Sequence, residues 1–293
     1  MKDKNATPLK TPFSWRGSKV RMLGKIVPIL EDARRGRRVY VEPFGGTGSV
    51  LLALTPFERE VYNDADERLV DFFRALADDE SRAKLRRWGE TFPQSRAIFD
   101  EMKRDWIKSP ELAKRGFATF YVQAFSFGGK PFDAFGYARK VCSKHGRDMS
   151  ALYRRRAASL DTFAERFHLT NVERLDWREV VDKYDSEQAF FYCDPPYLAP
   201  GSACYVADAR PVDWRELIDR LLTLKGGAAL SCYDCDECAA LREAGWTRYD
   251  FKASQSTAHS SRNANRARVE TLYVSPNRAA IVEEDAKLFG EVF

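Results

Sequence analysis

The segment AFFYCDPPY, residues 189–197, restricts the fold more than any other part of the chain. Its first five residues are apolar and have the length of a buried strand. The two prolines must end that strand, because proline fixes φ and lacks a backbone N–H. Open parallel sheets bind ligands at the carboxyl ends of their strands. The sequence therefore places Asp194 and Tyr197 at an edge where a ligand would bind.

Strand-like and helix-like segments alternate along much of the chain. Short apolar runs predict strands, and apolar residues at helical spacing predict helices. The expected strands cover 39–44, 60–64, 167–171, 188–197, 226–234 and 268–275. The expected helices cover 19–30, 48–54, 67–76, 212–224 and 236–245. This alternation predicts an α/β fold with a parallel sheet.

Between residues 78 and 165 the chain is helical, basic and aromatic, which predicts an insertion in the α/β domain. We expect a discontinuous domain of residues 1–77 and 166–280, and an exposed tail at 281–293. Residues 81–170 hold 19 Lys and Arg against 9 Asp and Glu. Such a basic block is typical of a segment that faces a polyanion, and it also occurs on an ordinary solvated helical face.

The remaining composition excludes some classes of protein. No apolar run approaches the ~20 residues of a membrane span, and the polar N-terminus lacks the apolar stretch of a signal peptide. We therefore expect a soluble, cytosolic protein. Cys232, Cys235 and Cys238 have the spacing C-x2-C-x2-C, which in other proteins can hold a metal. No fourth ligand follows, so we expect no metal and interpret Cys232 as the end of a buried strand.

A glycine-rich turn follows the expected strand at 39–44. The motif runs from Glu42 through Phe44 to Gly46 and Gly48. Glycines at a strand-to-helix turn allow a ligand to approach the backbone closely. The turn lacks the third glycine of a dinucleotide loop and the Gly-Lys-Ser/Thr of a phosphate loop. Together with the acidic Glu42, these absences favour a cationic nucleoside without phosphate.

Asp64 ends the next expected strand. A carboxylate at this position can accept both hydroxyl groups of a ribose. Asp64 and Asp66 also precede the helix-like run ERLVDFF, so either could cap that helix. We favour the ribose-binding role for Asp64, because the glycine-rich turn precedes it.

Asp194, Pro195, Pro196 and Tyr197 combine a carboxylate, an unpaired carbonyl and an aromatic face. An exocyclic aromatic amine is a poor nucleophile, because its lone pair is delocalised into the ring. Accepting its two N–H bonds at Asp194 and at the Pro195 carbonyl would localise that lone pair. Tyr197 would stack on the base and hold the base in line with a methyl donor.

Three motifs now occur in a defined order. They are Phe13–Lys19 (FSWRGSK), Phe44–Gly48 (FGGTG) and Asp194–Tyr197 (DPPY). With an insertion between the second and third, the chain resembles the adenine-N6 DNA methyltransferases of the Dam-like (D12) class over about residues 11–275. The resemblance implies a Rossmann-like S-adenosylmethionine-dependent methyltransferase sheet with a helical target-recognition insertion.

The resemblance also implies residue roles. S-adenosylmethionine would be held by Trp15, Lys19, Glu42, Phe44, Gly46, Gly48, Asp64, Asp176 and Asp194. Asp176 would lie near the adenine of the cofactor, and Asp194 would serve both its methionine end and the target amine. Arg16 and Ser18 stand where alanine and glycine are commoner in the class. The insertion also lacks the pattern of GATC-recognising members, so no recognition sequence is predicted.

The expected partner is double-stranded DNA, bound by a monomer or weak dimer. Flipping the target adenine out of the duplex requires groups that stabilise the opened strand and its phosphates. Aromatic candidates are Phe125, Phe127, Phe132, Phe135 and Tyr137, some of which we expect in the core of the insertion. Basic candidates are Arg16, Lys130, Arg139, Lys140, Lys144, Arg147, Arg262 and Arg266.

Other functions remain compatible with parts of this pattern. Cytosine-N4 enzymes more often carry serine at the position of Asp194, which favours adenine as the target. An RNA substrate is left open. A catalytically silent DNA-binding protein is disfavoured by the intact Asp194 and Tyr197, and a dinucleotide-dependent oxidoreductase by the missing third glycine.

Overall fold

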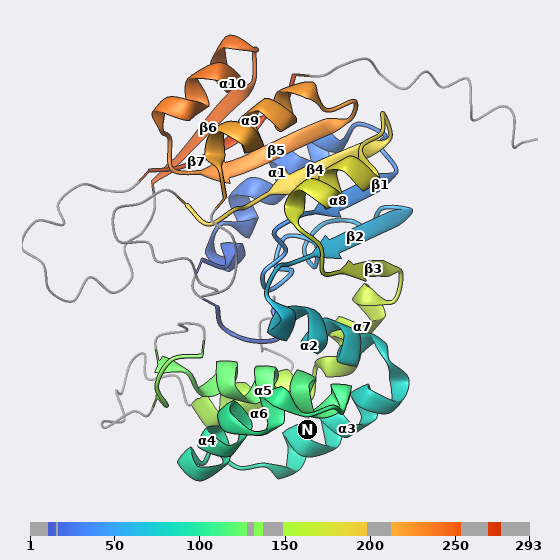
Figure 1. Ribbon diagram of the computed structural model, residues 1–293, viewed down its shortest axis with the longest axis vertical. Helices are drawn as coiled ribbons and strands as arrows, with labels where there is room; N and C mark the ends of the chain where they lie inside the picture. Colours follow the sequence, from blue (N-terminus) through green and yellow to red (C-terminus); the bar gives the residue numbers. More distant parts are fainter. Residues whose placement is uncertain are drawn as a thin grey trace, which may run out of the picture. The chain divides into compact units, whose positions relative to one another are not determined.

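The computed structural model of the 293-residue chain describes residues 11–15, 17–127, 132–136, 149–197, 212–252 and 269–276. Its helices are α1 (Leu23–Arg34), α2 (Glu67–Ala77), α3 (Asp79–Thr91), α4 (Arg96–Arg104), α5 (Leu112–Phe125), α6 (Met149–Ala157), α7 (Leu160–Phe167), α8 (Trp177–Tyr184), α9 (Trp214–Thr223) and α10 (Ala239–Glu243) (Figure 1). Short 3-10 helices are η1 (Lys19–Arg21), η2 (Trp106–Lys108) and η4 (Asp236–Cys238). In the described ranges, no helix has the length and apolar character needed to cross a membrane.

The strands are β1 (Val39–Glu42), β2 (Arg59–Asn63), β3 (Thr170–Glu173), β4 (Ala189–Cys193), β5 (Gly227–Cys232), β6 (Thr247–Lys252) and β7 (Val269–Val274). They form a seven-stranded mixed sheet in the order β3-β2-β1-β4-β5-β7-β6. The expected α/β fold is confirmed.

The chain divides into two compact units. Unit 1 comprises residues 1–24, 45–54 and 62–176, and unit 2 comprises residues 25–44, 55–61 and 177–293.

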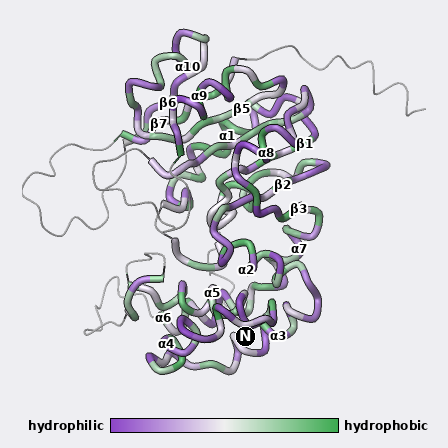
Figure 2. The backbone as a smooth tube through the Cα atoms, in the orientation of Figure 1, coloured by the Kyte–Doolittle hydropathy of each residue, from purple (hydrophilic) through white to green (hydrophobic). Residues whose placement is uncertain are grey.

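Unit 2 contains the buried strands that position the Asp194 segment. β1 pairs in parallel with β4, and β4 pairs in parallel with β5. All residues of β4 and β5 are buried, and both strands are largely hydrophobic along their length (Figure 2). In the view of Figure 1, α8 and α9 cross in front of these strands and α1 passes behind them. Each of α8 and α9 buries a tryptophan and a stripe of aliphatic residues. These helices protect the apolar strands from water.

Strand β7 runs antiparallel to β5, with Leu230 opposite Tyr273. An antiparallel strand begins at the edge where its parallel neighbours end. The first residues of β7, Val269 and Glu270, therefore lie at the same edge of the sheet as the carboxyl ends of β4 and β5.

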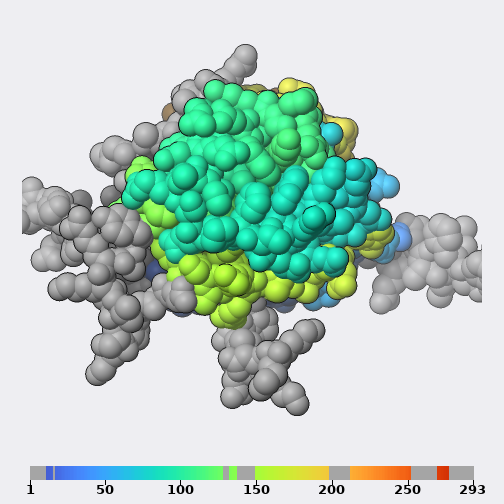
Figure 3. Space-filling model, turned by 90° about the horizontal axis from the view of Figure 1, so that it is seen from below, coloured from blue at the N-terminus to red at the C-terminus, as the bar shows by residue number. Residues whose placement is uncertain are grey.

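Unit 1 is built mainly of helices, and α5 is its central element. Ten residues of α5 are buried, and the helix contacts α2, α3, α4 and α6. Aromatic rings fill the space between these helices: Phe72 and Phe120 stack with centroids 6.1 Å apart. Helices between residues 79 and 125 form much of the surface seen in Figure 3, with α6 and α7 beside them.

The structure corrects three expectations about elements. Residues 48–54 form hydrogen-bonded turns rather than the expected helix, because Gly48 has a φ of +63° and helical hydrogen bonding is not continuous after it. The strand expected at 167–171 begins later, at Thr170, because Phe167 still belongs to α7. Strand β6 was not expected. The helices α3 to α7 lie within or beside the segment 78–165, whose boundaries as a domain remain a prediction.

The contact between α2 and α5 yields a test of the packing in unit 1. A Cβ atom on Gly116 would lie 2.6 Å from the Cβ of Ala75 and 3.2 Å from the carbonyl oxygen of Asp71. We expect Gly116→Ala to lower the free energy of unfolding by about 1–2 kcal/mol, because overpacking outweighs the gain in helix propensity. Gly24→Ala is the matched control. Its Cβ meets nothing within 4 Å, so we expect a gain of about 0.5 kcal/mol. Urea unfolding measures both variants, and equal effects would contradict the described packing.

Candidate functional site

The glycine-rich turn of unit 1 has a backbone that only glycine adopts readily. Gly46 and Gly48 have φ values of +53° and +63°. A Cβ on Gly45 would overlap the ring of Tyr62, whose hydroxyl donates a 2.6 Å hydrogen bond to the carbonyl oxygen of Gly46. A Cβ on Gly46 would meet nothing within 4 Å, so one side of this turn is open. The turn therefore presents accessible backbone to a ligand.

Asp64 holds the turn in place. Its Oδ2 accepts a 2.8 Å hydrogen bond from the Gly46 N–H, and its Oδ1 accepts one of 2.8 Å from the Asp66 N–H. Asp66, not Asp64, caps α2, because its side chain accepts from the Arg68 N–H. Burial raises the pKa of Asp64 to about 6, although these backbone hydrogen bonds oppose the shift. The carboxylate of Asp64 thus remains available for a role other than capping.

The N-terminal motif is joined to the same turn in unit 1. The hydroxyl groups of Ser18 and Thr47 lie 3.1 Å apart, within hydrogen-bonding distance. Lys19 is only 4% exposed, and its Nζ donates to the carbonyl oxygen of Gly17 over 3.3 Å. Trp15 is half-buried, with its ring 6.2 Å from that of Phe13. The structure thus supports an association between this motif and the glycine-rich turn, while Arg16 lies outside the described residues.

In unit 2, Glu42 ends β1 and is buried. The Tyr40 hydroxyl donates a 2.9 Å hydrogen bond to Glu42 Oε1. Next along the chain, Phe44 is half-buried, with its ring 6.2 Å from that of Trp177 and inclined at 36°. Asp176, which belongs to unit 1, is half-buried and directly precedes α8.

The segment Asp194–Tyr197 leaves the carboxyl end of β4. Asp194 is half-buried, Pro195 is buried and Pro196 is exposed. Tyr197 is half-buried, and its hydroxyl donates a 3.0 Å hydrogen bond to Glu270 Oε1. Its ring lies edge-on to that of Tyr233, with centroids 4.7 Å apart and planes at 73°. Burial, followed by the negative charges of Asp194 and Glu270, raises the pKa of the Tyr197 hydroxyl well above its usual range.

Cys193 precedes Asp194 and is fully buried. Burial and the charge of Asp194 raise the pKa of its thiol far above the ordinary value. Cys193 is therefore a neutral packing residue and no nucleophile.

Glu270 and Tyr233 contact Tyr197, and the sequence did not single them out. Glu270 is the second residue of β7, and Tyr233 follows the last residue of β5. Both segments were recognised as strand-like from their apolar residues. Their place beside Asp194–Tyr197 depends on the order of strands in the sheet, for which the sequence carries no local signal.

The aromatic residues expected near DNA differ in their surroundings. Phe125 is fully buried, and its ring packs on Tyr121 and Tyr153. Phe127 is 63% exposed. The ring of Phe132 lies under the guanidinium group of Arg68, 4.1 Å from its carbon. The other expected DNA-binding residues lie outside the described residues: Arg16, Lys130, Tyr137, Arg139, Lys140, Lys144, Arg147, Arg262 and Arg266.

Phe135 belongs to the core of the insertion. Its ring packs edge-on to that of Phe99, with centroids 5.3 Å apart.

The His, Cys, Asp and Glu side chains of the described ranges form no group of three or more that could hold a metal ion.

Comparison with known proteins identifies the family. A family model described as D12 class N6 adenine-specific DNA methyltransferase matches residues 15–207. This range contains the N-terminal motif from Trp15 onward, the glycine-rich turn, Asp64 and Asp194–Tyr197, whereas Glu270 lies beyond it. No curated protein sequence matches the chain.

The contact between Tyr197 and Glu270 gives a testable coupling. We expect Tyr197→Phe and Glu270→Ala to be non-additive in urea unfolding, with a coupling free energy of about 1–2 kcal/mol, because a hydrogen bond to a charged group is lost in either variant. Tyr249→Phe with Glu270→Ala is the control pair, since Tyr249 is paired with Leu272 across β6 and β7. Additive effects in the Tyr197 pair would contradict the described contact.

Proposed function

Since the chain belongs to the D12 class of N6 adenine-specific DNA methyltransferases, we propose that Asp194, the Pro195 carbonyl and Tyr197 engage the target adenine. Asp194 and the Pro195 carbonyl accept the two N–H bonds of the exocyclic amine. The nitrogen lone pair is then less delocalised into the purine ring and attacks the methyl group. Nitrogen bonds to the methyl carbon as that carbon's bond to the donor sulfur breaks, and one N–H proton passes toward the accepting Asp194 carboxylate. No covalent bond to the enzyme forms. Pro196 stiffens the segment next to the reacting base.

The observation that carries this proposal is the restrained position of Tyr197. Its hydroxyl is bound to Glu270 at 3.0 Å and its ring packs edge-on against Tyr233 at 4.7 Å. A ring held by a hydrogen bond at its hydroxyl and by a neighbouring ring loses little rotational freedom when a base stacks on it. Such preorganisation is what alignment of a weak nucleophile with an electrophilic methyl group requires.

The methyl donor of this family is an S-adenosylmethionine-type cofactor, and the chemistry of the predicted binding residues suits that molecule. When bound, it supplies a methyl group on a sulfonium centre. We assign Asp64 to the ribose hydroxyls, and Gly46 and Gly48 to the close approach of the ligand to the backbone. The open side of the turn at Gly46 supports this assignment. The glycine-rich motif Phe44–Gly48 contains no lysine or arginine, which suits a nucleoside without phosphate.

The remaining cofactor residues are assigned by their chemistry. Glu42 supplies a buried negative charge that suits a cationic ligand, and Phe44 an aromatic surface. Lys19 and Trp15 are assigned to holding the cofactor, because they belong to the motif that Ser18 joins to the turn. Asp176 recognises the adenine of the cofactor, and Asp194 serves its methionine end as well as the target amine.

DNA is the substrate of this family, and the target base must leave the duplex to reach Asp194. We propose that exposed aromatic residues of the insertion fill the gap in the duplex, with Phe127 the strongest described candidate because it is 63% exposed. Phe132 is already stacked under Arg68, so its role is to hold that guanidinium group toward a phosphate. The basic residues that the sequence assigns to DNA binding remain predictions, as does a monomeric or weakly dimeric state.

Product identification tests the proposal. Purified protein, S-adenosylmethionine and unmethylated genomic DNA are incubated, and the DNA is digested to nucleosides for mass spectrometry. We expect N6-methyladenine from the wild-type protein and a loss of at least about 10²-fold in Asp194→Ala, because the amine loses its acceptor. Asp219→Ala, an exposed position on α9, is the matched control. Detection of N4-methylcytosine would contradict the assignment of adenine as the target base. The absence of any methylated base would contradict the proposed activity.

The pKa of Asp64 gives a pH-dependent prediction for cofactor binding. The ribose hydroxyls donate to the ionised carboxylate, and the free protein protonates that carboxylate as the pH falls through about 6. We expect the dissociation constant of S-adenosylmethionine to rise about tenfold between about pH 8 and about pH 5, because only the ionised fraction binds. Calorimetric titration measures this change. Asp64→Asn should bind more weakly with a flat profile, whereas an unchanged wild-type profile would contradict the ribose role.

A further inference from the structure

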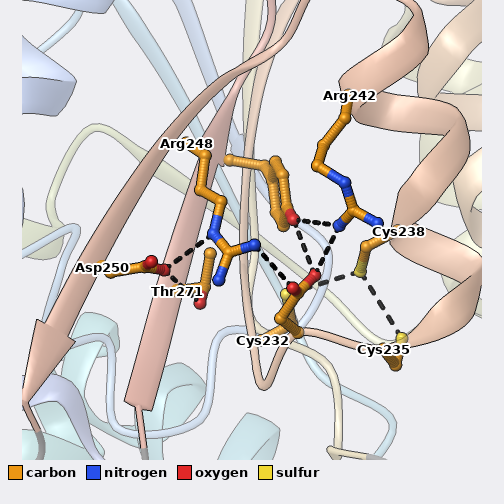
Figure 4. Close-up of polar contacts among 9 residues, drawn as sticks. Cys232, Cys235, Cys238, Arg242, Arg248, Asp250 and Thr271 are labelled. Atoms are coloured by element: carbon orange, nitrogen blue, oxygen red, sulfur yellow. Dashed lines mark hydrogen bonds and ion pairs between the residues drawn. The ribbon is translucent and has the colours of Figure 1, made fainter.

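Three cysteines gather at the carboxyl end of β5, in unit 2 (Figure 4). The Sγ of Cys238 lies 3.5 Å from the Sγ of Cys235 and 3.8 Å from the Sγ of Cys232. Cys232 and Cys238 are buried, whereas Cys235 is partly exposed. Cys238 is thus the central sulfur, and Cys235 is the one that a molecule in solution can reach.

The segment between these cysteines is held by charged groups at Asp234. One carboxylate oxygen of Asp234 accepts hydrogen bonds from Arg242 at 2.8 Å and from the Tyr273 hydroxyl at 2.7 Å. The other carboxylate oxygen accepts from Arg248 at 2.6 Å. Figure 4 shows both arginines converging on this carboxylate beside the three sulfur atoms. Asp234 is therefore fixed between Tyr233 and Cys235.

The backbone geometry suits a disulfide between Cys235 and Cys238. The Cys238 N–H donates a 3.1 Å hydrogen bond to the Cys235 carbonyl oxygen and so closes a four-residue turn. In such turns the end Cα atoms lie within about 7 Å of each other, and disulfides join Cα atoms about 4.4–6.8 Å apart. The two sulfurs need only approach from 3.5 Å to a bonded distance of about 2.05 Å.

The protonation states of the pair are complementary. The hydrogen bond from the Cys232 thiol lowers the pKa of Cys238 to about 6, so Cys238 is a thiolate at neutral pH. Burial and its hydrogen bonds to Glu237 and Cys238 raise the pKa of Cys235 to about 12. The protonated thiol of Cys235 therefore lies beside the buried thiolate of Cys238, which can accept its proton.

We propose that Cys235 and Cys238 form a dithiol site that exchanges with low-molecular-weight disulfides, and that the resulting disulfide slows methyl transfer. Cys235 attacks one sulfur of the small disulfide while its proton passes to Cys238. The released thiolate then takes that proton from Cys238. Cys238 next attacks the Sγ of Cys235, the mixed disulfide breaks, and a second small thiolate leaves. Two protein sulfurs are oxidised, and one small disulfide is reduced to one thiol and one thiolate, which takes a proton from water.

Tyr233 connects this site to Tyr197. Tyr233 lies between Cys232, the last residue of β5, and the fixed Asp234, and its ring packs against Tyr197 at 4.7 Å. Formation of the disulfide draws Cys238 away from Cys232, which lies 3.8 Å from it in the reduced protein. Cys232 directly precedes Tyr233, so the loss of this contact shifts the Tyr233 ring against Tyr197. The effect on activity rests on the proposed role of Tyr197 in stacking on the base, whereas formation of the disulfide does not.

The test uses the full-length reduced protein and oxidised glutathione. Intact mass and peptide mapping identify the disulfide, and nucleoside mass spectrometry measures N6-methyladenine. We expect a Cys235–Cys238 disulfide and about a tenfold loss of methyl transfer, because misplacement of a positioning group by about 1 Å can cost up to about 10²-fold. Dithiothreitol should reverse both changes. Cys235→Ser and Cys235→Ala, at a partly exposed position, should keep their activity in oxidised glutathione.

A Cys142→Ser/Cys204→Ser double variant is the matched control, because it removes two other cysteines and should respond like the wild type. A disulfide at another pair, or none, overturns the dithiol site. A Cys235–Cys238 disulfide with unchanged methyl transfer overturns its effect on activity. A reduced enzyme that makes no N6-methyladenine contradicts the proposed function instead, and the mapped disulfide still decides the chemistry of the thiols.

Discussion

Parallel pairing of β1, β4 and β5 is the constraint on which the described chemistry of unit 2 depends. The register aligns Val41 with Phe191 and Cys193 with Leu230, so the three strands end at one edge of the sheet. A buried strand cannot end there without placing its polar groups in contact with solvent, a ligand or another side chain. Glu42, Asp194 and Tyr233 therefore project from consecutive strand ends.

Antiparallel β7 completes the environment of Tyr197, because its first residues lie at the same edge as the ends of its neighbours. Glu270 accepts the phenolic hydrogen bond, and Tyr233 packs on the ring. Near the same edge, Cys238 lies 3.8 Å from Cys232, the residue before Tyr233. The proposed base-stacking residue and the proposed dithiol site are thus connected within one unit through Cys232 and the ring contact of Tyr233.

The sequence predicted what local chemistry decides and missed what long-range pairing decides. Two prolines end β4 whatever surrounds them, and the family match confirms the predicted class. Glu270 was missed because the residues of β7 carry no local signal for the strand with which β7 pairs. Strand β6 was missed because polar residues alternate with Tyr249 and Phe251 along this edge of the sheet, which weakens the apolar signal. The helix expected at 48–54 was wrong because helical hydrogen bonding is not continuous after Gly48.

The central claim is that two carboxylates have separate roles: Asp64 binds the cofactor, and Asp194 activates the target amine. Single-turnover methyl transfer to DNA, measured over a range of S-adenosylmethionine concentrations, tests this claim most directly. The account predicts that Asp64→Asn needs more cofactor yet approaches the wild-type rate at saturation. Asp194→Ala should remain at least about 10²-fold slower at saturating cofactor. A normal saturated rate for Asp194→Ala would contradict the account.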